Sequence, residues 1–85
     1  MRPRLMRYYF DLRDGDEVTP DEEGLEFASI ERVQEEAARS LTDMARDSIR
    51  RRAAGSAHRM AIEVRDHEGP VLQALLTFEV KHGRS

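Results

Sequence analysis

Residues 29–54, SIERVQEEAARSLTDMARDSIRRRAA, are the stretch around which the rest of the chain is arranged. Its apolar residues recur at intervals of three and four, which places one apolar stripe on a period of 3.6 residues. These residues are Ile30, Val33, Ala37, Leu41, Met44 and Ala45. Ser29 suits an N-cap, because its hydroxyl can accept a hydrogen bond from a free backbone N–H, and Gly55 suits the C′ position. The stretch therefore predicts a long amphipathic helix.

Before this helix, residues 5–13 alternate between apolar and polar side chains, which is typical of a half-buried strand. The apolar side is formed by Met6, Tyr8, Phe10 and Leu12. Asp14-Gly15 is a strong hairpin signal, and it predicts a short returning strand over 16–19 that ends at Pro20. Residues 21–24 indicate a second turn, and Leu25 and Phe27 indicate an extended pair that leads into the helix.

After the helix, the same alternation returns twice. Met60, Ile62 and Val64 share one side of a strand, and residues 71–80 alternate again after a turn-rich link at 66–70. Strands with one apolar side and a helix with one apolar stripe bury both by stacking, so we expect an α+β fold. The predicted architecture is a two-layer sandwich in ββαββ order, with a mainly antiparallel β-sheet and one long helix on one face. We expect a single domain over 5–81, with flexible tails at 1–4 and 82–85.

The composition excludes several classes of protein. The 85 residues include no cysteine, which excludes a disulfide framework and a thiolate nucleophile. No apolar run approaches the roughly 20 residues that cross a bilayer, and the basic N-terminus is not followed by an apolar signal region. We therefore expect a cytoplasmic protein that does not act at a membrane.

No catalytic or metal-binding pattern is found. The acidic run over 11–23 does not have the spacing of a calcium-binding loop, and turn formation explains its Asp and Gly residues. His58, His67 and His82 do not share a helical face, and no serine lies in a nucleophile elbow. We expect no enzyme activity, no cofactor, no metal site and no catalytic residue.

Arginines gather near the end of the predicted helix and just after it. They are Arg46, Arg50, Arg51, Arg52 and Arg59. Guanidinium groups in such a cluster can neutralise phosphates, which makes a nucleic-acid-associated regulator the alternative function. Against this alternative, the net charge is −3 and no aromatic residue lies among the arginines to stack on bases.

Two features favour self-association. A helix of about 25 residues is roughly 37 Å long, whereas strands of about nine residues reach ~30 Å, so we expect the arginine-rich helix end to overhang the sheet. Tyr9, Val71 and Leu75 are expected on the outer face of the sheet, and apolar patches on a sheet face commonly mark interfaces. These three residues and the five arginines are the candidate interaction residues.

Residues 7–15, RYYFDLRDG, and residues 21–24, DEEG, followed by the long helix, resemble a domain-of-unknown-function family of small proteins from rhizobia and related alphaproteobacteria. The resemblance covers nearly the whole domain. It implies a bacterial cytoplasmic protein, and it supplies no activity, ligand or functional residue. Because family members begin close to this strand, residues 1–5 look like an extension, and Met6 is an alternative start to Met1.

Taken together, these features favour a small, non-catalytic bacterial module for protein interaction or regulation. We expect it to form a homodimer and to bind a further protein partner. The pathway and the identity of that partner are not encoded in any recognisable motif.

Overall fold

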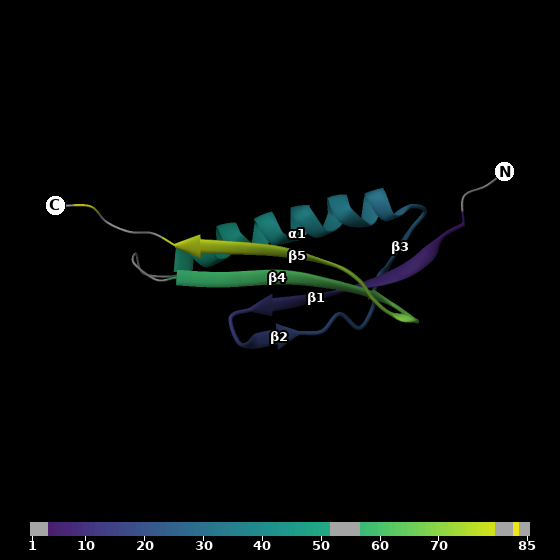
Figure 1. Cartoon of the computed structure of the whole chain (residues 1–85), viewed down its shortest axis with the longest axis horizontal. Coiled ribbons are helices and arrows are strands. Elements are labelled where there is room, and N and C mark those ends of the chain that lie inside the picture. Colours follow the sequence, from purple (N-terminus) through teal and green to yellow (C-terminus); the bar gives the residue numbers. More distant parts are fainter. Residues whose placement is uncertain (1–3, 52–56, 80–82, 84–85) are drawn as a thin grey trace.

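The computed structural model describes residues 4–51, 57–79 and 83. Its elements follow the chain as β1 (Met6–Asp14), β2 (Glu17–Thr19), β3 (Leu25–Phe27), α1 (Ile30–Arg51), β4 (Ala57–Asp66) and β5 (Gly69–Glu79). The strands form an antiparallel sheet in the order β2-β1-β4-β5, and β3 pairs with the first part of β1. The helix lies along one face of the sheet (Figure 1). The predicted α+β sandwich is confirmed, and the extended pair before the helix forms a short additional strand.

The helix begins as its sequence predicts. The Ser29 hydroxyl accepts a hydrogen bond from the Arg32 backbone N–H at 3.3 Å, and the Ser29 carbonyl accepts one from Val33 at 3.3 Å. The helix is described as far as Arg51, so the expected last turn and Gly55 lie outside the described residues, as do most of the two predicted tails. As far as the chain is described, α1 lacks the apolar length that a bilayer-spanning helix needs.

The predicted overhang of the helix is wrong for the described residues. The helix has 22 residues and β5 has 11, which correspond to about 33 Å and about 36 Å. The two elements therefore match in length, and Figure 1 shows them running alongside each other. The expectation failed because the second hairpin has longer strands than the alternation indicated.

The hydrophobic core lies between the helix and the sheet. Its buried members come from β1, α1 and β4 and are Tyr8, Phe10, Val33, Ala37, Leu41, Ala45, Met60, Ile62 and Val64. The ring of Phe27 packs edge-on against Phe10, with a centroid distance of 5.7 Å. Ile30 was expected in the apolar stripe but is 39% exposed, because it lies at the first turn of the helix. The core thus follows the period-2 and period-3.6 patterns of the sequence.

Both hairpins are tight. Gly15 has a φ of 63°, a value that favours glycine, and its N–H donates to the Arg59 carbonyl at 2.9 Å, which ties the first turn to β4. In the second hairpin only His67 and Glu68 separate the strands, so the turn is shorter than predicted. Pro70 lies within β5, which is an edge strand, as is usual for a proline in a sheet.

Candidate functional site

Arg65 organises the sheet face opposite the helix, which we call the uncovered face because no described element packs on it. Its Nε donates to Asp11 Oδ2 at 2.9 Å, and its Nη2 donates to Asp11 Oδ1 at 3.4 Å. The guanidinium carbon lies 4.6 Å from the centre of the Tyr9 ring, within cation–π range. The hydrogen bond to Asp11 raises the pKa of Arg65, although desolvation acts in the opposite direction. Arg65 is therefore a charged group that holds β4 to β1.

Asp21 links this cluster to the chain that returns from the first hairpin. Its carboxylate accepts hydrogen bonds from the backbone N–H groups of Phe10, Glu23 and Gly24, at 3.0, 3.1 and 3.1 Å. Its own N–H donates to Asp11 Oδ1 at 2.9 Å. Burial alone would raise the pKa of Asp21, but the three backbone hydrogen bonds, aided by the positive charge of Arg65, lower it. Asp21 thus acts as an ionised acceptor at a turn between β2 and β3.

Gly24 completes this turn by fitting closely against β1. Its φ is 71°, and a Cβ at this position would lie 2.9 Å from the Tyr8 carbonyl oxygen and 2.9 Å from the Tyr9 ring. Glycine therefore meets both the backbone conformation and the space that the turn requires. The residues that carry the family resemblance, including Asp21 and Gly24, hold the N-terminal strands together.

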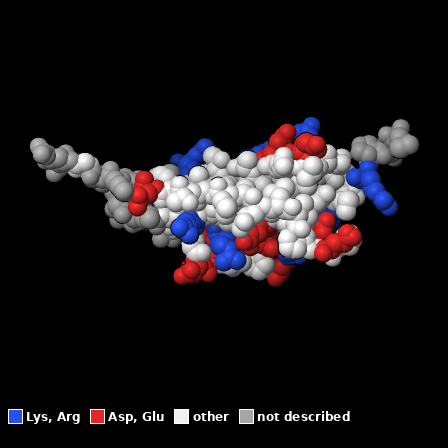
Figure 2. Space-filling model, viewed as in Figure 1, with Lys and Arg blue, Asp and Glu red and all other residues white. Residues whose placement is uncertain are grey.

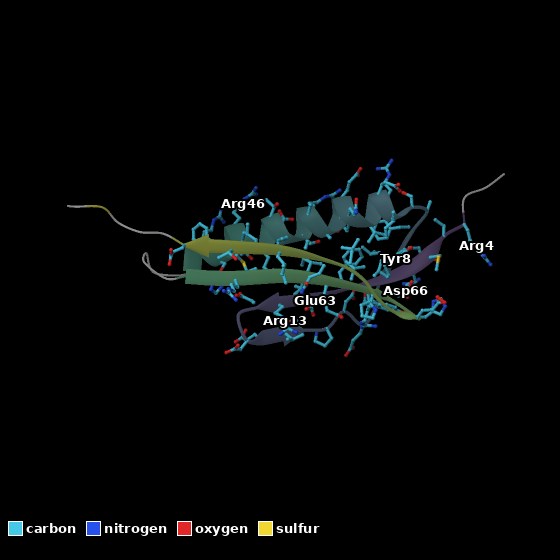
Figure 3. All side chains as sticks on the ribbon, viewed as in Figure 1. Arg4, Tyr8, Arg13, Arg46, Glu63 and Asp66 are labelled. Atoms are coloured by element: carbon cyan, nitrogen blue, oxygen red, sulfur yellow. The ribbon has the colours of Figure 1, made fainter. Side chains whose placement is uncertain are left out.

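The charges next to Arg65 on the uncovered face also contact one another. Arg13 Nε lies 3.4 Å from Glu63 Oε2, and the Gln73 side-chain amide donates to the same oxygen at 3.0 Å. Figure 3 shows Arg13 and Glu63 on the side of the sheet away from the helix. These contacts join β1, β4 and β5. The surface is polar at these positions, and its charged side chains bind one another.

Of the three apolar candidates for interaction, the structure exposes one. Leu75 is 70% exposed and is the most exposed large hydrophobic side chain among the described residues. Tyr9 is half-buried beneath Arg65. Val71 is also half-buried and packs against the core, because a register shift between Val64 and Arg65 makes it the extra residue of a β-bulge. The three residues therefore do not form one exposed apolar patch, and their part in an interaction stays a prediction.

The candidate arginines are not gathered on one surface. Arg46 and Arg50 are exposed on α1, and Figure 3 shows Arg46 pointing away from the sheet. Arg59 alternates with the buried Met60 on β4, so it lies on the uncovered face, on the other side of the sheet. The Arg51 side chain and Arg52 lie outside the described residues. The three described candidate arginines thus lie on two sides of the molecule and do not form one basic surface.

A groove that the sequence did not predict lies between α1 and the first hairpin. It has a volume of about 740 Å³, and its acidic lining residues are Asp14, Glu17, Asp43 and Asp47. His58 is 7% exposed, and its Nε2 contacts Asp14 Oδ1. Among the described residues no group of three metal-ligating side chains converges on one point. The alternation that buries Met60 also directs the His58 side chain toward the helix side of the sheet. This pattern could have predicted the contact of His58 with Asp14.

The two edges of the sheet differ. At one edge, β2 and β3 each have three residues, and β2 begins with Glu17 and is followed by Pro20, features that discourage further strand pairing. At the other edge, β5 has 11 residues and its only charged residue is Glu79, at its end. No described strand pairs with the outer side of β5. A long, uncharged edge offers unpaired backbone groups to another strand.

Comparison with known proteins identifies one family. The family model described as "Domain of unknown function (DUF6894)" matches residues 7–77. No curated protein and no solved structure matches the sequence significantly.

Proposed function

This chain belongs to the DUF6894 family, and from its surfaces we propose that it is a small, non-catalytic protein-interaction module that works as a homodimer in the bacterial cytoplasm. The observation that carries the proposal is the open edge of β5. Strand addition to an exposed edge supplies main-chain hydrogen bonds without requiring a deep pocket, and it is a common mode of protein recognition.

The exposed Leu75 supports the same proposal. Its side chain lies on the uncovered face of β5, where alternate residues are Gln73 and Thr77. In a monomer, an exposed leucine on an uncharged edge strand favours aggregation, whereas in an assembly it can form a contact. Leu75 and the β5 edge thus place apolar contact area and free backbone groups at one site.

The charged residues of the uncovered face support a structural rather than a catalytic role. Arg65 and Asp11 are bound to each other, and Arg13 is paired with Glu63. A general acid, base or nucleophile must be available to a substrate, whereas these groups join neighbouring strands. We therefore assign the binding function to the strand edge and not to the charged clusters.

Native mass spectrometry of the untagged protein tests the proposal. A dimer without added mass, over about 1 to about 200 µM protein so that micromolar dissociation constants are covered, is the expected result. A monomer at every concentration would contradict the homodimer. A stoichiometric metal, small molecule or oligonucleotide that persists after desalting would contradict the assignment of function to protein contacts alone.

A further inference from the structure

The outer edge of β5 continues onto one side of the helix. Ser40, Asp43 and Asp47 line the groove that faces the β1–β2 hairpin, so they lie on the helix side toward that hairpin. With 100° between successive residues, the opposite side of α1 is formed by Glu31 in the first turn and then by Gln34, Ala38 and Thr42. Because α1 packs against both β5 and β4, this opposite side borders the β5 edge.

The middle of this helix side, from Gln34 to Thr42, carries uncharged side chains, whereas Glu31 places a charge at its beginning. Gln34, Ala38 and Thr42 are exposed, and the Thr42 hydroxyl donates to the Ala38 carbonyl at 2.8 Å, so its hydrogen atom is used within the helix. Figure 2 shows an uncharged band through the middle of the molecule, over the region where Figure 1 places β5, whereas charged side chains lie over the first half of α1. The β5 edge and the middle of this helix side, from Gln34 to Thr42, therefore form one uncharged surface, which we call the β5–α1 surface.

We propose that the β5–α1 surface binds a second copy of this chain, with the two β5 strands pairing antiparallel about a two-fold axis at Leu75. This inference rests on the proposed homodimer and specifies how it is built. Pro70 and the bulge at Val71 disrupt the beginning of the edge, and Glu79 ends the uncharged part. The regular segment between them runs from Leu72 to Phe78, and its midpoint is Leu75.

The pairing that follows from this midpoint is complementary. A two-fold axis perpendicular to the sheet keeps each side chain on its own face, so paired residues must share a face. Leu75 then meets its own copy on the uncovered face, flanked by Gln73 opposite Thr77. On the helix side, Leu72 lies opposite Phe78 of the other copy. No charged residue faces a like charge in this segment, whereas like charges in directly opposed positions destabilise a sheet.

The helices fit the same arrangement. Neighbouring strands are about 4.8 Å apart, so a helix above β4 and β5 lies about 5 Å from the axis, and the two helices lie about 10 Å apart. Packed helices are separated by 8–10 Å when the side chains between them are small. Ala38 and Thr42 meet this requirement. The two helices also run antiparallel, so that their macrodipoles oppose each other favourably. A strand from an unrelated partner would leave this side of the helix without a matching surface.

Single cysteines test the geometry, because the chain has none of its own. Leu75→Cys places the two sulfur-bearing residues directly opposite each other, within reach of a disulfide. The matched control is Thr77→Cys, on the same face of the same strand. In this pairing the two copies of residue 77 are four residues out of register, about 13 Å apart, too far for a disulfide. Both residues are exposed, so both variants should fold, and circular dichroism checks this.

Under mild oxidation, we expect a disulfide-linked dimer of Leu75→Cys that forms at least ten times faster than that of Thr77→Cys. Equal rates, or faster linkage of Thr77→Cys, in a protein that native mass spectrometry shows to be dimeric would overturn the β5 pairing and leave the homodimer standing. A wild-type chain that is monomeric at every concentration would overturn both. These results distinguish failure of this inference from failure of the proposed function.

Discussion

Asp21→Ala removes the acceptor that holds the turn between β2 and β3. The carboxylate accepts hydrogen bonds from the backbone N–H groups of Phe10, Glu23 and Gly24. A hydrogen bond to a charged group contributes about 1.5–3 kcal/mol, and contributions at one group are not additive. We therefore expect the free energy of unfolding to fall by about 3 kcal/mol, a large share of the 5–15 kcal/mol typical of a small domain.

Urea denaturation followed by circular dichroism measures this loss. With a denaturant slope of about 1.5 kcal/mol per molar, a loss of about 3 kcal/mol lowers the urea midpoint by about 2 M. Protein concentration must be the same for all variants, because association with a second copy would itself stabilise the fold.

The matched control for this experiment is Glu22→Ala. Glu22 is adjacent to Asp21 and exposed, and exposed substitutions usually change stability by less than about 0.5 kcal/mol. If Asp21→Ala costs no more than Glu22→Ala, Asp21 is an ordinary surface residue, and the structural role assigned to residues 21–24 is wrong.

Three further predictions concern the pKa of Asp21, the two turn glycines and the proposed dimer contact at Ala38. Because the folded pKa of Asp21 lies below its unfolded value of 3.8, its stabilisation is complete above that value and is lost as pH falls through the folded pKa; the difference in urea midpoint between wild type and Asp21→Ala should shrink steadily below about pH 3.8. Gly24→Ala should cost about 2–4 kcal/mol, because of its positive φ and its close approach to β1, whereas Gly15→Ala, with a similar φ but open space, should cost about 1 kcal/mol; thermal unfolding of both compares them. Ala38→Arg should raise the dimer dissociation constant at least tenfold in sedimentation experiments, whereas Arg39→Ala, on the neighbouring exposed position of α1, should leave it unchanged.

The parts of the fold that sequence predicts well are those with local causes. Three such features are the alternation in β1 and β4, the Asp14-Gly15 turn and the Ser29 cap. Each depends on residues that are close together in the sequence. The structure confirms them because burial and hydrogen bonding act on the same short segments.

The contacts that the sequence did not predict join distant segments. Arg65 is 54 residues from Asp11 and 44 from Asp21, and nothing in the sequence alone brings these three residues together. The Val71 bulge has a similar origin, because it depends on the register between β4 and β5 and not on either strand by itself. The exposure of Leu75 was predicted, since it requires only the alternation of its own strand.

In the proposed dimer, the unequal edges of the sheet would set a limit on assembly size. A surface that pairs with its own copy about a two-fold axis consumes the pairing edge of both molecules. The short β2 edge, with Glu17 and the following Pro20, then remains at each outer end of the joined sheet. Such an assembly is closed at two copies, and its ends resist the addition of further molecules that would produce fibrils.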